Sequence, residues 1–127
     1  MKTHETFSSF SVDDVGKAKA FYRDTLGLDV SDEKGMGLEL RLSRGARAFL
    51  YPKKDHRPAT FTVLNFVVKD IDATVDELAA AGVRFEHYQG EIATDGKGIH
   101  RRSGGDEPDI AWFKDSAGNI LSVLQEK

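Results

Sequence analysis

Polar and apolar residues alternate in two similar segments of the chain. Residues 7–15 read FSSFSVDDV, and residues 63–71 read VLNFVVKDI. When the two segments are placed 56 positions apart, Asp14 matches Asp70 and the apolar positions beside it also match. Because a repeat of this kind marks a repeated supersecondary unit, the pattern predicts two βα-plus-strand modules that share one core.

Each copy is followed by apolar residues at helical spacing. The stripes over residues 15–26 and 71–79 place apolar side chains three and four positions apart, as one face of a helix requires. An aspartate before each stripe can accept the first amide hydrogens of a helix, and a glycine after it allows the left-handed backbone that ends one. The expected caps and terminating glycines are Asp13 or Asp14, Gly27, Asp70 and Gly82.

Alternation with period two predicts the strands, as residues 38–42 (LELRL) and 83–88 (VRFEHY) illustrate. The expected extended segments are 7–12, 28–30, 38–42, 47–51, 61–68, 83–88, 110–114 and 120–125. Residues 52–58 are basic and bounded by prolines, which is typical of a solvated connector. Residues 89–108 are the one long irregular stretch, either a functional lid or a mobile loop. The resulting order is βαβββ, twice.

The amino-acid composition argues against several classes of function. The chain has 127 residues, of which 39% are hydrophobic and 31% charged, and this is typical of one globular domain. A net charge of -3 gives no basic surface for nucleic acid, so no nucleic-acid partner is expected. The absence of cysteine excludes disulfides, cysteine-containing zinc sites and thiol catalysis. No apolar run is long enough for a membrane span or a signal peptide, so no membrane partner and a cytoplasmic location are expected.

Two motifs give the chain a family resemblance. The first is VDD at 12–14 with AFYRDTLG at 20–27, and the second is WFKDSAGNIL at 112–121. They resemble the "D…FY…LG" helix and the "F-x-D-P-x-G-N" hairpin of the vicinal oxygen chelate superfamily, with Ser116 where the family often has proline. That superfamily includes glyoxalases, bleomycin resistance proteins and extradiol dioxygenases.

The resemblance implies an α+β fold and a single domain over residues 1–127. Two βαβββ modules, at about 7–52 and 61–125, would form a curled mixed sheet cup with helices on its outer face. It also implies a homodimer.

The resemblance places metal ligands at positions where this chain has none. The family's metal enzymes use the first strand of each module, here Phe7 and Val63, and the last strand, here Ser122. The fourth position lies on strand 47–51, which contains no carboxylate. A catalytic metal needs about three His, Asp, Glu or Cys ligands, so no metal and no other cofactor are expected. A relocated metal site, for example at His87, stays open as an alternative.

No catalytic residue stands out in the sequence. There is no G-x-S-x-G motif, and apart from His4 in the polar lead-in, the serines of the first strand have no histidine near them in the chain. Strand alternation from the family positions instead predicts an apolar pocket with a few small polar groups, which suits a small molecule. The candidate ligand-binding residues are Phe7, Ser9, Ser11, Tyr51, Val63, Asn65, His87, Trp112 and Ser122.

Two functions remain. The leading one is a metal-free small-molecule-binding protein of the glyoxalase/bleomycin-resistance type that sequesters a partly apolar or aromatic ligand. The alternative is a glyoxalase-like lyase or isomerase with a relocated metal site or a metal-independent mechanism. The sequence leaves open whether the protein is an enzyme.

Overall fold

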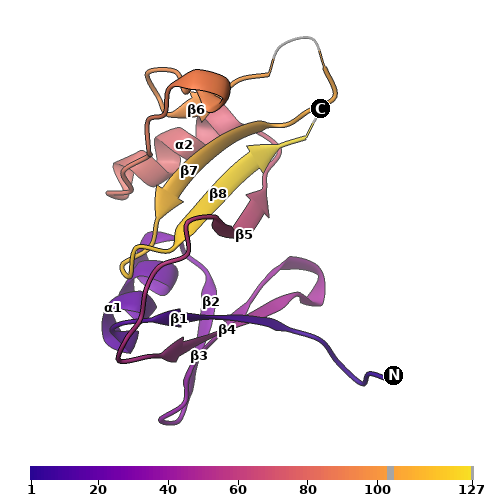
Figure 1. The fold of residues 1–127 in the computed structure, drawn as a ribbon, viewed down its shortest axis with the longest axis vertical. Coiled ribbons are helices and arrows are strands. Elements are labelled where there is room, and N and C mark those ends of the chain that lie inside the picture. Colours follow the sequence, from indigo (N-terminus) through magenta and orange to yellow (C-terminus); the bar gives the residue numbers. More distant parts are fainter. Residues whose placement is uncertain (103–104, 127) are drawn as a thin grey trace. The chain divides into compact units, whose positions relative to one another are not determined.

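The structure is a computed structural model that describes residues 1–102 and 105–126. The chain forms two compact units, Met1–Pro58 and Ala59–Lys127, and each is described by itself (Figure 1). Within the described residues, no helix has both the length and the apolar character needed to cross a bilayer.

Unit 1 contains a four-stranded mixed sheet and one helical segment. Its sheet has the order β1-β4-β3-β2, in which β1 and β4 are parallel and the other pairs antiparallel. Its elements are β1 (Ser8–Val12), α1 (Val15–Lys19), a π-helical segment (Ala20–Thr25), β2 (Asp29–Glu33), β3 (Gly37–Arg41), a 3₁₀ turn (Ser43–Gly45) and β4 (Arg47–Pro52).

The first helix covers the predicted residues, but the hydrogen bonding in its second half differs from that of an α-helix. Asp14 caps it, because its side chain accepts a hydrogen bond from the Lys17 amide at 3.0 Å. The prediction of one helix over 15–26 is incomplete, because the second half is π-helical. There the amide of Leu26 donates to the carbonyl of Phe21, five residues back, at 3.0 Å.

The core of unit 1 lies between the helical segment and one face of the sheet. Alternate residues of the strands are fully buried, and α1 contacts β3 and β4. The largest buried side chains of this core are Val12, Tyr22, Leu38, Leu40 and Leu50. The strand residues between these, such as Glu39 and Phe49, point to the opposite face, which we call the open face of the sheet.

Unit 2 repeats this plan. Its sheet has the order β5-β8-β7-β6, with β5 and β8 parallel and the other pairs antiparallel (Figure 1). Its elements are β5 (Thr62–Val67), α2 (Ile71–Ala80), a 3₁₀ turn (Gly90–Ile92), β6 (Ile99–His100), β7 (Asp109–Lys114) and β8 (Ile120–Gln125). Asp70 caps α2 through a bond from the Ala73 amide at 3.0 Å. The α+β class and the two βαβββ modules are therefore confirmed.

The strand predicted over residues 83–88 is wrong. This segment forms only an isolated bridge, between Phe85 and Phe113, and one further bond from the Glu86 amide to the Trp112 carbonyl at 2.8 Å. The alternation in its sequence reflects the burial of Val83 and Phe85 beside more exposed neighbours. Period-two burial therefore occurs here without a continuous ladder.

The second strand of the second module comes instead from the stretch predicted to be irregular. Asp95 shapes a tight turn, because its Oδ1 accepts bonds from the amides of Lys97 and Ile99, both at 2.9 Å. Gly98 lies against Phe85, where a Cβ atom would come within 2.8 Å of the Phe85 Cβ. The chain can then return as β6 and pair with β7. Residues 103 and 104 of this stretch lie outside the described residues.

Candidate functional site

Three neighbouring strands of unit 2 bring together a row of predicted site residues. Trp112 on β7 is in register with Ser122 on β8, and Ser122 is in register with Asn65 on β5. Ser122 is fully buried, and its hydroxyl donates a hydrogen bond to the Asn65 side-chain oxygen. The row therefore carries an indole ring on β7 and an exposed carboxamide on β5, with the buried Ser122 between them.

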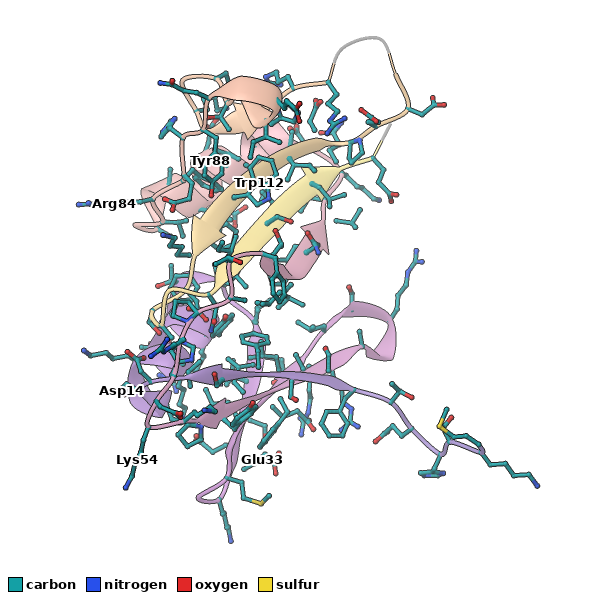
Figure 2. All side chains as sticks on the ribbon, in the orientation of Figure 1. Asp14, Glu33, Lys54, Arg84, Tyr88 and Trp112 are labelled. Atoms are coloured by element: carbon teal, nitrogen blue, oxygen red, sulfur yellow. The ribbon has the colours of Figure 1, made fainter. Side chains whose placement is uncertain are left out.

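An aromatic cluster extends this row at Trp112. The Tyr88 ring meets the Trp112 ring edge to face, with centroids 5.5 Å apart (Figure 2). The centroid of the His100 ring lies 6.2 Å from that of Trp112. The carbonyl of Ala93 accepts a bond from the His100 Nδ1 at 2.8 Å, so this ring is held in place. Burial, followed by the charge of Glu86, raises the pKa of the Tyr88 hydroxyl. The Tyr88 hydroxyl therefore stays protonated and uncharged at neutral pH.

The open face of the unit 1 sheet carries a pocket of about 190 Å³. Its lining consists of apolar and charged side chains from β3, β4 and the segments before β1 and around the β2–β3 turn: Phe7, Glu33, Met36, Glu39, Arg47, Ala48 and Phe49. We call it the Phe49 pocket. The Arg47 guanidinium lies over the Phe7 ring, 5.6 Å from its centroid.

Three more predicted residues lie on the parallel strand pair of unit 1: Ser9 and Ser11 on β1, and Tyr51 on β4. Ser9 is in register with Phe49, and Ser11 with Tyr51. The Ser11 hydroxyl is hydrogen-bonded to the Nδ1 atom of His56 at 2.7 Å.

His56 was missed by the sequence reasoning, which assigned residues 52–58 to a solvated connector. It reaches Ser11 because the connector turns back, with the His56 amide bonded to the Lys53 carbonyl at 3.0 Å. The two residues are 45 positions apart, so no local pattern links them. The histidine that contacts Ser11 therefore comes from a distant connector, which the sequence around the first strand does not reveal.

Val63 and His87 do not fit the predicted pattern of inward-facing strand residues. The β5–β8 register shifts between Thr62 and Leu64, so Val63 falls at the irregularity in the ladder. His87 is exposed and lies in the connection between α2 and β6. The structure places His100, on β6, next to the aromatic cluster instead.

The four positions that the resemblance assigns to metal ligands do not fit a divalent ion. In the β1–β4 ladder Ser9 faces Phe49 as Asn65 faces Ser122 in the β5–β8 ladder, so the fourth position corresponds to Phe49. Phe7, Phe49 and Val63 offer no donor atom, and the Ser122 hydroxyl is engaged with Asn65. Within residues 1–102 and 105–126, no group of three His, Asp or Glu side chains could hold a metal ion.

Comparisons with known proteins agree with the fold. The sequence profile of the Glyoxalase/Bleomycin resistance protein/Dioxygenase superfamily matches residues 6–123. No curated protein sequence matches the chain significantly.

Solved structures share the fold at low sequence identity. The fosfomycin resistance protein FosX from Listeria monocytogenes aligns with a TM-score of 0.73 and 13% identity, over 100% of this chain and 96% of that one. Lactoylglutathione lyase from Agrobacterium tumefaciens aligns with a TM-score of 0.69 and 20% identity, over 98% and 95% of the two chains. TnmS3, an antibiotic binding protein from a Streptomyces species, aligns with a TM-score of 0.66 and 21% identity over 100% of both chains. The resemblance read from the two sequence motifs is confirmed, and the chain belongs to the glyoxalase/bleomycin resistance protein/dioxygenase superfamily.

Proposed function

We propose that this protein binds a small, partly apolar or aromatic molecule without a metal ion. The observation that carries the proposal is the row of Trp112, Ser122 and Asn65 on unit 2. It joins a stacking surface to a polar side chain, and small-molecule sites combine these two features. The similarity to an antibiotic binding protein gives the proposal further support.

The polar end of the row can donate a hydrogen bond to one acceptor group of a ligand. The Asn65 side-chain oxygen is occupied by the Ser122 hydroxyl, which fixes the orientation of the carboxamide. The Asn65 NH₂ group then points its donors away from Ser122 on an exposed residue. A ligand carbonyl or phenolic oxygen could accept from this NH₂ while its ring stacks on Trp112.

The metal-free part of the proposal is supported by the donor set. A divalent ion needs side chains that can donate an electron pair, and Phe7, Phe49 and Val63 have none. The competing proposal is a glyoxalase-like lyase or isomerase with a relocated metal site or a metal-independent mechanism.

Trp112 is the single tryptophan of the chain, so intrinsic fluorescence reports on this site alone. We would titrate the protein with bleomycin, fosfomycin and a set of small quinone and naphthol natural products, with free N-acetyltryptophanamide as the inner-filter control. We expect saturable quenching by an aromatic member of the set, unchanged by EDTA or by added Ni²⁺ or Zn²⁺. Quenching that requires added metal, or conversion of the ligand that EDTA stops, would favour the competing enzyme.

A matched pair of variants locates the binding. Asn65→Asp keeps the oxygen that accepts from Ser122 and removes the NH₂ donor, so affinity should fall about tenfold, the worth of one hydrogen bond. Lys69→Gln, at an exposed position before α2, should leave affinity unchanged. Equal affinities for Asn65→Asp and Lys69→Gln would show that the ligand does not bind at the row.

A further inference from the structure

The Phe49 pocket has a charge arrangement that the proposed function does not use. Arg47 already has partners within the protein: its Nη1 donates to Glu39 at 2.8 Å, its Nη2 donates to Glu5, and its guanidinium lies over Phe7. The second oxygen of Glu39 accepts from the Arg41 Nε at 2.9 Å. These groups therefore neutralise one another.

Glu33 is a further charged residue of the pocket lining, and it takes no part in the ion pairs of Arg47 and Glu39. It stands at the end of β2, opposite Gly37 on β3, and is labelled in Figure 2. Among the residues that the structure describes, no ion pair involves Glu33, whereas Glu39 has two. The hydrogen bond to Glu39 is the main cause that raises the pKa of Arg41, and the charge of Glu33 is the last of the causes that raise it. An exposed methionine, Met36 at 69% accessibility, and the Phe49 ring complete the apolar walls around it.

The protein's own Arg47 shows which kind of group this face accommodates. Its planar cation lies between a phenyl ring and carboxylates, the environment in which cation–π attraction and charge-assisted hydrogen bonds act together. The Phe49 pocket repeats these components, an aromatic wall and a carboxylate, with space between them.

We propose that the Phe49 pocket binds an organic monocation, an amidinium, guanidinium or ammonium group attached to one aromatic or apolar ring. Glu33 would accept hydrogen bonds from the cation, while Phe49, Phe7 and Met36 would cover the ring. The volume of about 190 Å³ suits one ring with its substituent, since a cavity of roughly 150 Å³ holds benzene. The proposal does not depend on Trp112, because the pocket lies in the other unit.

The test uses three probes of nearly equal shape: benzamidine, benzamide and benzoate. Each is titrated into the ¹⁵N-labelled full chain, and the amide signals of residues 33–36 and 47–49 are followed. We expect benzamidine to shift these signals saturably, with an affinity about tenfold or more above that of benzamide, as one charge-assisted hydrogen bond provides. Tighter binding of benzoate would show that Arg47 makes an anion site, and equal binding of benzamidine and benzamide would show that charge is not read; either result overturns the proposal.

Two variants with the same change in net charge separate a local contact from a general field. Glu33→Gln keeps the shape of the pocket and removes its carboxylate charge, so benzamidine affinity should fall about fivefold to tenfold. Asp32→Asn removes the neighbouring carboxylate, which pairs with Lys19 on α1 and lies outside the pocket lining. It should leave benzamidine affinity within about twofold, because an exposed charge outside the pocket is screened by salt. Equal losses in both variants would refute a specific site at Glu33.

Discussion

Asp115 organises the hairpin between β7 and β8, and its removal should destabilise unit 2 strongly. Its Oδ1 accepts bonds from the amides of Ala117 at 2.9 Å and Asn119 at 2.8 Å, and its Oδ2 accepts from the Asn119 side chain at 3.0 Å. Asp115 is 6% exposed and Asn119 is 2% exposed, so the donors left behind by a deletion have little access to water. The hairpin sets the register that places Trp112 opposite Ser122.

The size of the effect follows from these three bonds. Deleting the carboxylate removes the acceptor of three buried donors, and an orphaned buried donor costs about 1–3 kcal/mol, so the three together give about 3–9 kcal/mol. Because the turn can open slightly and admit water, we take the lower part of the sum and expect Asp115→Ala to lower the free energy of unfolding by about 3–5 kcal/mol. Asp115→Asn keeps the Oδ1 acceptor for the two backbone amides. It places an NH₂ group against the side-chain NH₂ group of Asn119, so a smaller loss of about 1–2 kcal/mol is expected.

Urea denaturation followed by Trp112 fluorescence measures this directly, because the single tryptophan lies in the same unit as the hairpin. Asp13→Ala is the control: Asp13 is exposed and the neighbouring Asp14 provides the helix cap, so the loss should stay within about 0.5 kcal/mol. A loss below about 1 kcal/mol in Asp115→Ala, or equal losses in Asp115→Ala and Asp115→Asn, would refute the organising role of the Asp115 carboxylate in the hairpin.

Two further predictions concern the backbone and the loop contacts. Gly37 has φ of 144° and a Cβ there would lie 2.1 Å from the Leu50 carbonyl oxygen, so Gly37→Ala should cost about 2–5 kcal/mol in thermal or urea unfolding. Gly35→Ala, with φ of 71° and open space around it, should cost only about 1–2 kcal/mol, and equal costs would contradict the steric argument. Hydrogen bonds from Arg101 and then Lys97 lower the pKa of Asp72 from 3.8 to about 2, so the stability from this exposed network is complete above pH 4 and is lost as pH falls towards 2. The protection of the amides of residues 95–101 against hydrogen exchange, relative to their intrinsic rates at each pH, should therefore fall over that pH range and in molar NaCl, and a wild-type profile no different from that of Asp72→Asn would disprove the contribution.

Local chemistry made much of each module predictable. Asp14 and Asp70 cap helices because a short carboxylate before an apolar stripe can satisfy the first amides, and this depends only on neighbouring residues. The β8 boundaries, Ile120–Gln125, agree with the prediction because the strand directly follows the Asp115 turn. The π-helical turn at Ala20–Thr25 was not predictable, because its side-chain spacing is close to that of an α-helix.

The candidate site also has parts that the sequence could predict and parts that it could not. Asn65, Ser122 and Trp112 were all candidate residues from the sequence, and the structure aligns them in one row because a hairpin and a parallel pair fix register over short distances. The contacts of His56 with Ser11 and of His100 with Trp112 could not be predicted, since each depends on where a connecting segment turns back onto the sheet.

The sequence alone determined that two βαβββ modules form, because amphipathic period, caps and turn residues act within a few positions of one another. Only the tertiary structure decided that residues 83–88 form a single bridge, that β6 comes from the stretch after Gly90, and that Arg47 pairs with Glu39 rather than with Glu33 in the part of the chain that the structure describes. These outcomes depend on which distant backbone and side-chain groups compete for the same partner. That competition is settled by packing in three dimensions, and the order of residues along the chain does not record it.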